Sequence, residues 1–209
     1  MFIVNPGAGQ GSAVRLMPEI EARAGRGNYP FEVARTSAPG DAGRIAAEAV
    51  DAGFTHIVAV GGDGTSHEIV NGAAGKDFIL GIIPCGSGND FPKSAGIPAD
   101  KQSAIDTVFG SRLIEADTGK SGAEYFINGL GIGLGGAVSH RFRKLKRMRL
   151  QAGYLIAAVQ EALSFKAFEA GITIGDSRFE GAMLLAGASN GISQGGFRLA
   201  PGSRIYDGL

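Results

Sequence analysis

Short apolar runs alternate with longer helix-forming stretches over the first part of the chain, from Met1 to about Asp117. The run at 57–60 is apolar at every position, which is typical of a strand covered on both faces. Strands that alternate with helices predict right-handed crossovers and a parallel sheet in a three-layer α/β domain. The predicted strands lie at 2–4, 31–34, 57–60 and 78–83, and the predicted helices lie near 12–24, 40–52, 65–73 and 100–109.

The pattern changes after residue 118. Two helical stretches now follow each other, and the strands after them have no helix between them that is long enough for a parallel crossover. Antiparallel pairing is the expected consequence. We therefore predict an α/β domain at 1–118 and a mainly antiparallel β domain with helices at 119–209. The strands of this second domain are predicted at 125–132, 172–174, 182–188 and 197–199, and its helices at about 137–149 and 151–165.

Three predicted strands of the first domain each end in a glycine-rich loop, at 5–11, 61–65 and 85–90. Glycine allows the backbone to pass close to a ligand because it has no Cβ. The carboxyl ends of parallel strands share one edge of the sheet, where ligands bind in α/β proteins. The three loops are therefore expected to converge on one crevice.

Asp63 lies in the middle of the second loop, next to a predicted helix. Thr65 is expected to be the N-cap of this helix, and Glu68, three residues later, would complete a capping box. The free N–H groups and the positive dipole end of such a helix favour an anion. Asp63 can act among them only if a metal or a proton offsets its charge. Metal-bound nucleotide phosphate is the simplest ligand of this kind.

The composition fits an ordinary folded enzyme, with 44% hydrophobic residues and 20 basic residues balanced by 20 acidic ones. The 35 glycines suit many tight loops, since the chain has no low-complexity repeat. The single cysteine, Cys85, excludes an internal disulfide and favours a reduced cytoplasm. No apolar stretch reaches the ~18 residues of a membrane span, and no signal peptide is evident.

One segment is strongly basic although the chain as a whole is neutral, because six of the ten residues at 140–149 are Lys or Arg. Phe142, Leu145 and Met148 share one helical face between these cations, a pattern that suits docking to an anionic lipid surface. A solvated helix with its apolar face in the core is the alternative interpretation. Nucleic-acid binding is not expected, because the rest of the chain supplies no basic surplus.

These motifs resemble the diacylglycerol kinase catalytic domain of bacterial lipid kinases, a family that includes sphingosine and ceramide kinases. The segment at 5–9 is similar to the family's first nucleotide loop, and Thr36 with 40–42 is similar to its second ATP-contacting segment. The stretch at 61–72 resembles the signature that holds the phosphates. The stretch at 83–91 matches the family's Pro-x-Gly-Thr-x-Asn-Asp-Phe pattern, with Ser87 in place of the usual Thr.

The resemblance continues to the last residue, because 126–133, 195–201 and 207–209 look like landmarks of the family's second domain. It implies a first domain like that of NAD kinases and phosphofructokinases, followed by an incomplete β domain. It also implies ATP and Mg²⁺ as cofactors and transfer of the γ-phosphate to a lipid hydroxyl such as that of diacylglycerol. Asp63 would be the catalytic residue that holds or orients Mg²⁺. The implied nucleotide-binding residues are Asn5, Pro6, Gly7, Ala8, Gly9, Thr36, Gly61, Gly62, Asp63, Gly64, Thr65, Glu68, Ser87, Asn89 and Asp90.

Arg204, Asp207 and Leu209 resemble a structural Mg²⁺ site of bacterial members, built from two backbone carbonyls and the Asp207 carboxylate. Oxygen ligands suit this hard cation. The implied partner is a lipid alcohol at a membrane surface, for a cytoplasmic protein that is peripheral to the inner face of the membrane and possibly a homodimer. The identity of the acceptor stays open.

Two other classes stay open. A soluble metabolite kinase related to NAD kinases also uses a Gly-Gly-Asp-Gly loop, and a nucleotide-binding regulatory protein without turnover would keep the same phosphate loops. In the resembling family, a segment beyond the Asp-Gly-Leu motif carries the general base, and no residue here matches that segment. We therefore expect a C-terminally truncated chain, with the base beyond Leu209, that binds nucleotide but phosphorylates lipid poorly or not at all.

Overall fold

The structure is a computed structural model that describes residues 1–144 and 150–208. The chain forms two compact units, one made of Met1–Asn128 with Ser189–Leu209 and the other of Gly129–Ala188. Each unit is described by itself below. The domain boundary expected at residue 118 stays a prediction.

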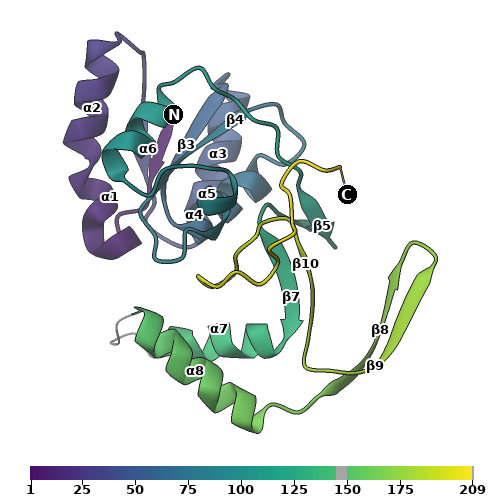
Figure 1. Cartoon of the computed structure of the whole chain (residues 1–209). Helices are drawn as coiled ribbons and strands as arrows, with labels where there is room; N and C mark the ends of the chain where they lie inside the picture. Colours follow the sequence, from purple (N-terminus) through teal and green to yellow (C-terminus); the bar gives the residue numbers. More distant parts are fainter. Residues whose placement is uncertain (145–149, 209) are drawn as a thin grey trace. The chain divides into compact units, whose positions relative to one another are not determined.

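A four-stranded parallel sheet forms the centre of the first unit, in the order β2-β1-β3-β4 (Figure 1). The register places Ile3 of β1 opposite Ala59 of β3, and Ala59 opposite Ile82 of β4. The parallel α/β arrangement expected from the alternating pattern is confirmed. The strands are β1 (Phe2–Val4), β2 (Val33–Arg35), β3 (His56–Gly61) and β4 (Ile79–Pro84).

Helices link these strands, close to the positions that the sequence predicts. The stretch at 12–24 forms two helices that meet at Leu16, because Pro18 has no N–H to donate to the carbonyl of Val14. The helical elements of the first unit are η1 (Ala8–Gly11), α1 (Ser12–Arg15), α2 (Met17–Arg26), α3 (Asp41–Asp51), α4 (Asp63–Gly72), α5 (Asp90–Ser94) and α6 (Lys101–Val108).

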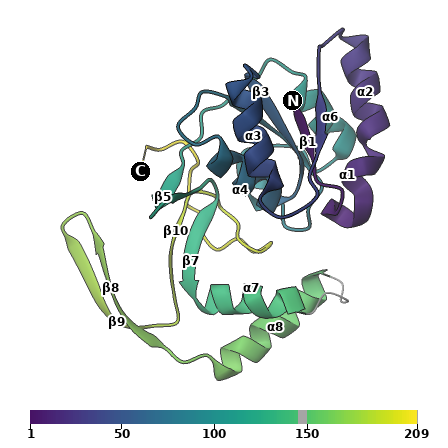
Figure 2. The same ribbon diagram turned by 180° about the vertical axis from the view of Figure 1, so that it is seen from behind.

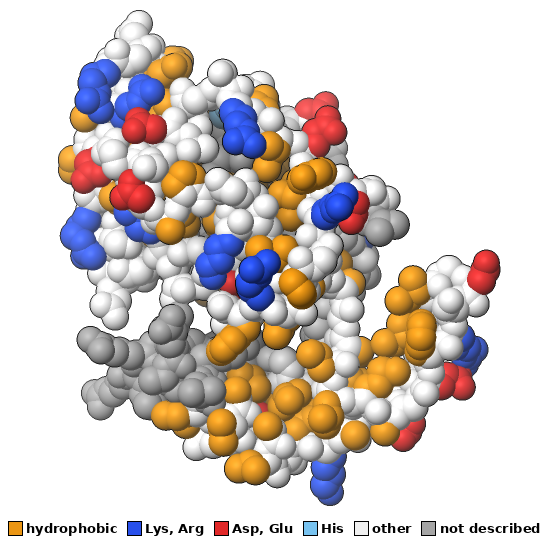
Figure 3. Space-filling view, in the orientation of Figure 1, with side chains coloured by type: hydrophobic (Ala, Val, Ile, Leu, Met, Phe, Trp, Pro, Cys, Tyr) orange, Lys and Arg blue, Asp and Glu red, His pale blue; other side chains and the backbone are white. Residues whose placement is uncertain are grey.

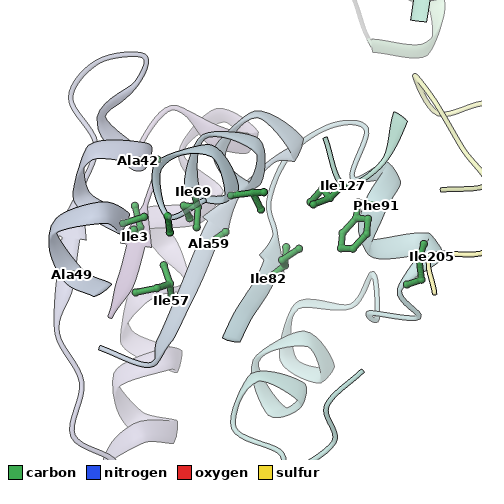
Figure 4. Packing of buried hydrophobic residues seen from close by; sticks show 13 residues of the cluster. Ile3, Ala42, Ala49, Ile57, Ala59, Ile69, Ile82, Phe91, Ile127 and Ile205 are labelled. Atoms are coloured by element: carbon green, nitrogen blue, oxygen red, sulfur yellow. The ribbon is translucent and has the colours of Figure 1, made fainter. Parts of the chain in front are cut away.

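The sheet buries both of its faces. Successive residues of a strand point to opposite sides, so Ile57 packs with α3 and α4, whereas its neighbour Val58 packs with α1, α2 and α6. Figure 4 shows the first of these clusters, in which Phe91, Ile127 and Ile205 continue the core past the edge of the sheet. The result is a three-layer core whose sheet is covered on both sides.

The α3 and α4 helices approach each other at a pair of glycines. A Cβ on Gly72 would lie 2.0 Å from the carbonyl oxygen of Gly43, and a Cβ on Gly43 would lie 2.8 Å from the carbonyl oxygen of Glu68. The obstacles are backbone atoms, which cannot swing aside. This packing fixes the position of α4, whose first turn carries Asp63.

A short antiparallel pair, β5 (Gly119–Ser121) and β6 (Glu124–Phe126), is joined to α4 by two hydrogen bonds between Asn71 and the Tyr125 backbone. The strand expected at 125–132 is interrupted after Phe126. The carbonyl of Asn128 accepts from the N–H groups of Asn190 and Gly191, so the chain changes its pairing partner there.

The segment after Ser189 returns to the first unit, where Ile205 is buried in the core. The prediction of a strand at 197–199 is wrong. Phe197 forms only an isolated bridge with Gln194, because Gly195 and Gly196 between them adopt left-handed conformations that turn the chain sharply.

The second unit is built from β7 (Gly129–Gly133), α7 (Leu134–Lys144), α8 (Leu150–Ser164), β8 (Phe168–Ile174), β9 (Ser177–Met183) and most of β10 (Leu185–Ser189), as Figure 2 shows from behind. The strand β10 pairs with β7, and β8 pairs with β9 in an antiparallel hairpin. The expected antiparallel character is therefore confirmed, although β8 starts earlier than predicted and the strand expected at 182–188 is divided between β9 and β10.

Hydrophobic side chains gather on one exposed surface of the second unit, over α8 and the hairpin (Figure 3). Leu163 of α8 is 85% exposed, and Ile174 and Phe179 of the hairpin are also exposed. Residues 145–149 of the basic segment lie outside the described residues, and the segment's proposed contact with lipid stays a prediction. Among the described helices, none is both long and apolar enough to span a bilayer.

The glycine contact between α3 and α4 gives a direct test of this packing. Changing Gly72 to Ala should destabilise the protein by about 1–3 kcal/mol, because the new methyl group meets a backbone carbonyl. Changing Gly25 to Ala in α2, where a Cβ would meet nothing within 4 Å, should stabilise it by about 0.5–1 kcal/mol. Urea denaturation of both variants measures the difference. A neutral effect of the Gly72 change would contradict the described helix contact.

Candidate active site

The three glycine loops lie together at the carboxyl edge of the parallel sheet. The N–H of Asn5 donates to the carbonyl of Val60 at 3.0 Å, and the N–H of Cys85 donates to that of Gly61 at 2.7 Å. A side-chain bond, from Asn5 Nδ2 to Thr65 Oγ1 at 3.2 Å, links the first loop to the second. The loop convergence expected from strand order is therefore present.

Glycines allow these loops to touch through their backbones. A Cβ on Gly62 would lie 2.9 Å from the Cα of Gly86, and a Cβ on Gly9 would lie 2.3 Å from the carbonyl oxygen of Cys85. Gly9 also has a φ of +54°, which disfavours a side chain. The loops can therefore make these backbone contacts only because glycine occupies these positions.

The N-cap of α4 lies about one turn before Thr65, the N-cap that the sequence predicts. Gly62 is its N-cap and Asp63 its first residue, and no side chain caps the helix. Thr65 is buried and accepts from Asn5, so the assignment of Thr65 as N-cap is wrong. Glu68 likewise forms no capping box, because its Oε2 accepts from the N–H of Ala42 at 3.2 Å and supports the start of α3.

Asp63 and Asp90 bring two carboxylates to the same place. Asp63 Oδ1 accepts from the N–H of Asp90 at 2.8 Å. A Cβ on Gly88 would lie 2.8 Å from Asp63 Oδ2 and 3.4 Å from Asp90 Oδ2, so both groups surround this glycine. Burial raises the pKa of Asp63, and the charge of Asp90 adds to the increase. The site therefore has a deficit of positive charge, which a bound cation would relieve.

Asp90 is buried, and its carboxylate accepts hydrogen bonds from a distant part of the chain. The N–H of Gly196 donates to its two oxygens at 3.1 and 3.2 Å, and Lys93 Nζ lies 3.1 Å from its Oδ1. Neither partner was expected from the sequence. The spacing of Lys93, three residues beyond Asp90 on one helix, could have indicated the ion pair, but nothing in the sequence relates Gly196 to this loop.

Asn89 shapes the third loop in a left-handed conformation, with φ at 49°. Its Nδ2 donates to the carbonyl of Gly86 at 2.7 Å. Its Oδ1 is buried without a hydrogen-bond partner among the described residues. Buried polar atoms are rarely left unpaired, so this oxygen is a candidate ligand atom in the same loop as Asp90.

Cys85 and Lys101 lie on the buried side of the third loop. Lys101 Nζ donates to the carbonyl of Pro84. Burial raises the pKa of the Cys85 thiol, while Lys101 and Ser12 act in the opposite direction. A buried, protonated thiol serves as a small apolar residue in this turn. Lys101 was not among the residues expected at the site.

The remaining expected residues also lie on these loops or at the same edge of the sheet. The N–H of Gly7 donates to Asn5 Oδ1 at 3.0 Å, and the N–H of Thr36 donates to the carbonyl of Val4 at 2.9 Å, so both lie at this edge of the sheet. Ser87 and Gly64 are exposed. Pro6, Ala8 and Gly61 belong to the same loops. Their roles in nucleotide binding stay predictions.

The expected structural Mg²⁺ site near the end of the chain is only partly described. Arg204 and Asp207 are exposed, and Leu209 lies outside the described residues. Asp117 lies beside this segment, since its N–H donates to the carbonyl of Ile205 and its Oδ2 accepts from the N–H of Gly208 at 2.9 Å. Within the described part of the chain, no group of three His, Cys, Asp or Glu residues is placed to hold a metal. This site stays a prediction.

A parallel α/β sheet whose loops gather two carboxylates at a helix N-terminus is suited to handling phosphate groups. Comparison with known proteins identifies the family. Residues 1–121 match the model of the diacylglycerol kinase catalytic domain. The chain belongs to this family.

The sequences of named relatives match nearly the whole chain. The diacylglycerol kinase of Bacillus subtilis is 34% identical over 100% of this chain and 70% of its own length. That of Staphylococcus saprophyticus is 33% identical, over 99% of this chain and 69% of its own. The crystal structure of a diacylglycerol kinase from Bacillus anthracis matches with a TM-score of 0.79 and 28% identity, over 99% of this chain and 69% of that one.

The raised pKa of Asp63 predicts a change in stability with pH. Between the ordinary value of 3.8 and the raised value, the folded chain holds more protons than the unfolded chain, so stability falls as pH rises through this window. Changing Asp63 to Asn should therefore raise Tm at pH 7 and give no gain well below pH 3.8, where the carboxyl is protonated in both states. Thermal melts of both proteins at pH 7 and well below pH 3.8 measure this. A gain that is the same at both would contradict the assigned pKa.

Proposed function

We propose that the chain is the nucleotide-binding and catalytic part of an ATP- and Mg²⁺-dependent lipid kinase, which transfers the γ-phosphate of ATP to a lipid hydroxyl such as that of diacylglycerol. The observation that carries the proposal is the position of Asp63. It lies at the first residue of α4, between three glycine loops and next to a second carboxylate. Membership of the diacylglycerol kinase family supports the reaction type.

The phosphates of ATP would lie on the loops at the carboxyl edge of the sheet. No side chain caps α4, and the N–H of Thr65 donates to the carbonyl of Gly62, so the N–H groups of Asp63 and Gly64 are the ones offered to an anion. The glycines at 61, 62 and 64 leave this backbone open to close approach. In phosphoryl transfer the protein mainly positions the reactants and stabilises charge, which matches a site built from backbone groups.

The donor atoms also fit Mg²⁺. The ion prefers oxygen ligands and usually binds through one or two carboxylates together with substrate phosphates. Asp63, with Asn89 and Asp90 nearby, offers carboxylate and amide oxygens, and the unpaired Oδ1 of Asn89 is part of this set. Bound Mg²⁺ would neutralise charge that develops on the phosphates. The chain's own part is to hold the Asp63 carboxylate in position through its bond from the Asp90 N–H.

A lipid hydroxyl is the proposed acceptor because of what the relatives are named. They include diacylglycerol kinases and a Chromohalobacter salexigens protein named "Probable lipid kinase YegS-like", which is 32% identical over 92% of this chain. We propose that the protein meets such a lipid at a membrane surface, where the basic segment at 140–149 would favour anionic headgroups.

A phosphate-transfer assay tests the reaction and the acceptor together. The chain is incubated with γ-labelled ATP and Mg²⁺ in separate reactions, each with one candidate acceptor. The acceptors are diacylglycerol in anionic vesicles, ceramide in the same vesicles, NAD and a sugar phosphate. Because this chain is expected to phosphorylate lipid poorly, the expected result is ATP binding, with any transferred label in diacylglycerol. Label in NAD would instead indicate a soluble metabolite kinase.

The role of Asp63 gives a separate prediction. Changing Asp63 to Asn should leave the fold intact but remove the Mg²⁺-dependent part of ATP binding, because the amide cannot offset the ion's charge. Calorimetry with Mg²⁺ and with EDTA measures this. The matched control is Asp51→Asn, at the exposed end of α3 where Asp51 pairs with Lys76, and it should bind as the unchanged chain does. Identical Mg²⁺ dependence in the Asp63 variant would refute the assignment.

A further inference from the structure

We propose that Arg15 is a phosphate-binding residue of the candidate active site, where it supplies the cation for the polyphosphate of ATP. This inference rests on the proposed function and adds a residue to it. Arg15 is the last residue of α1, four positions beyond the first glycine loop. It belongs to none of the motifs from which the site was expected.

The position of the guanidinium is set by the loop itself. Arg15 turns back toward the loop, so that its Nη1 donates to the carbonyl of Gln10 at 3.1 Å. A Cβ on Gly11 would lie 3.3 Å from the same nitrogen. The charged group therefore lies directly against the backbone of the first loop, and this loop contacts the third one through Gly9 and Cys85.

This part of the loop is held in an uncommon conformation. Gly9, Gln10 and Gly11 all have positive φ, at 54°, 55° and 83°. A left-handed conformation is costly for a residue with a side chain such as Gln10. The bond from Arg15 to the Gln10 carbonyl helps to hold the loop in this shape. The same bond fixes the cation at the loop surface, where an incoming phosphate would lie.

Arg15 keeps most of its donors for a ligand. A guanidinium has five N–H groups, and within the described part of the chain only the bond to Gln10 engages those of Arg15. No ion pair between Arg15 and a described carboxylate is present, and the residue is exposed. A planar guanidinium can donate two parallel hydrogen bonds to two oxygens of one phosphate. The free N–H groups of Arg15 therefore suit a phosphate ligand.

Two lysines around the loops are already engaged. Lys93 pairs with Asp90. Lys101 donates to the carbonyl of Pro84 on the buried side of the third loop. A triphosphate carries several negative charges beside Asp63 and Asp90, and these two carboxylates make the site more negative still. Arg15 is a cation whose position against the first loop and free donors can balance that charge.

Arg35 ends β2 at the same edge of the sheet and is exposed. It stands opposite Val4 in the register, so the two side chains point to the same face of the sheet. Val4 packs with the residues of α1, α2 and α6. Arg35 is therefore directed to the same face of the sheet as α1, the helix that ends in Arg15.

Calorimetric titration of the full chain with AMP, ADP and ATP, each with Mg²⁺, tests the assignment. Changing Arg15 to Gln should weaken ATP binding roughly tenfold, the value of one charge-assisted hydrogen bond. It should weaken ADP binding less and leave AMP binding nearly unchanged. Arg15→Lys should recover part of the loss, because it keeps the charge but not the planar fork.

The matched control is Arg26→Gln, an exposed arginine at the far end of α2, which should bind all three nucleotides as the unchanged chain does. An equal loss for AMP, ADP and ATP would show that Arg15 only holds the loop, and no loss would show that it has no role in binding; either result overturns the assignment while the proposed function stands. Failure of the unchanged chain to bind ATP would refute the proposed function and this assignment with it. Thermal melts of each variant verify folding.

Discussion

The contact between the backbones of Gly62 and Gly86 is the interaction on which the candidate site depends. Because β3 and β4 are neighbours in a parallel sheet, their following loops leave the same edge, and only residues without side chains let them touch. This contact brings Asp63 at the start of α4 within hydrogen-bond distance of the Asp90 backbone. A side chain at either glycine would separate the two carboxylates and displace the first turn of α4.

Gathering two carboxylates at one point costs free energy, and the structure offsets this cost with donors from several elements. The N–H of Asp90 stabilises the Asp63 carboxylate, while the N–H of Gly196 and the ammonium of Lys93 stabilise that of Asp90. The pKa of Asp63 still rises, because burial outweighs these bonds. The two carboxylates therefore leave the site with excess negative charge that a cation could neutralise, which is the basis for the metal-assisted phosphoryl transfer proposed above.

The first unit depends on a segment that is distant in the sequence. Residues after Ser189 bring Gly196 to Asp90 and Ile205 into the hydrophobic core, and Asn190 donates to the carbonyls of Asp117 and Ile127. The second unit, in contrast, keeps apolar side chains such as Leu163 and Phe179 exposed. The proposed chemistry and the packing that holds its residues thus lie in the same compact unit.

The sequence by itself determined the parallel sheet, the three loops at its carboxyl edge and the central place of Asp63. These features follow from local patterns, namely an apolar run, a glycine turn and a helix, repeated in chain order. The details at helix ends needed the tertiary structure: Thr65 and Glu68 fit a capping box by spacing, yet their oxygens bond to Asn5 and Ala42. Only folding could place Gly196 on Asp90, because their 106-residue separation leaves no local signal. The proposed role of Arg15 could not be predicted for a related reason, because it depends on the left-handed backbone conformation of the loop before it.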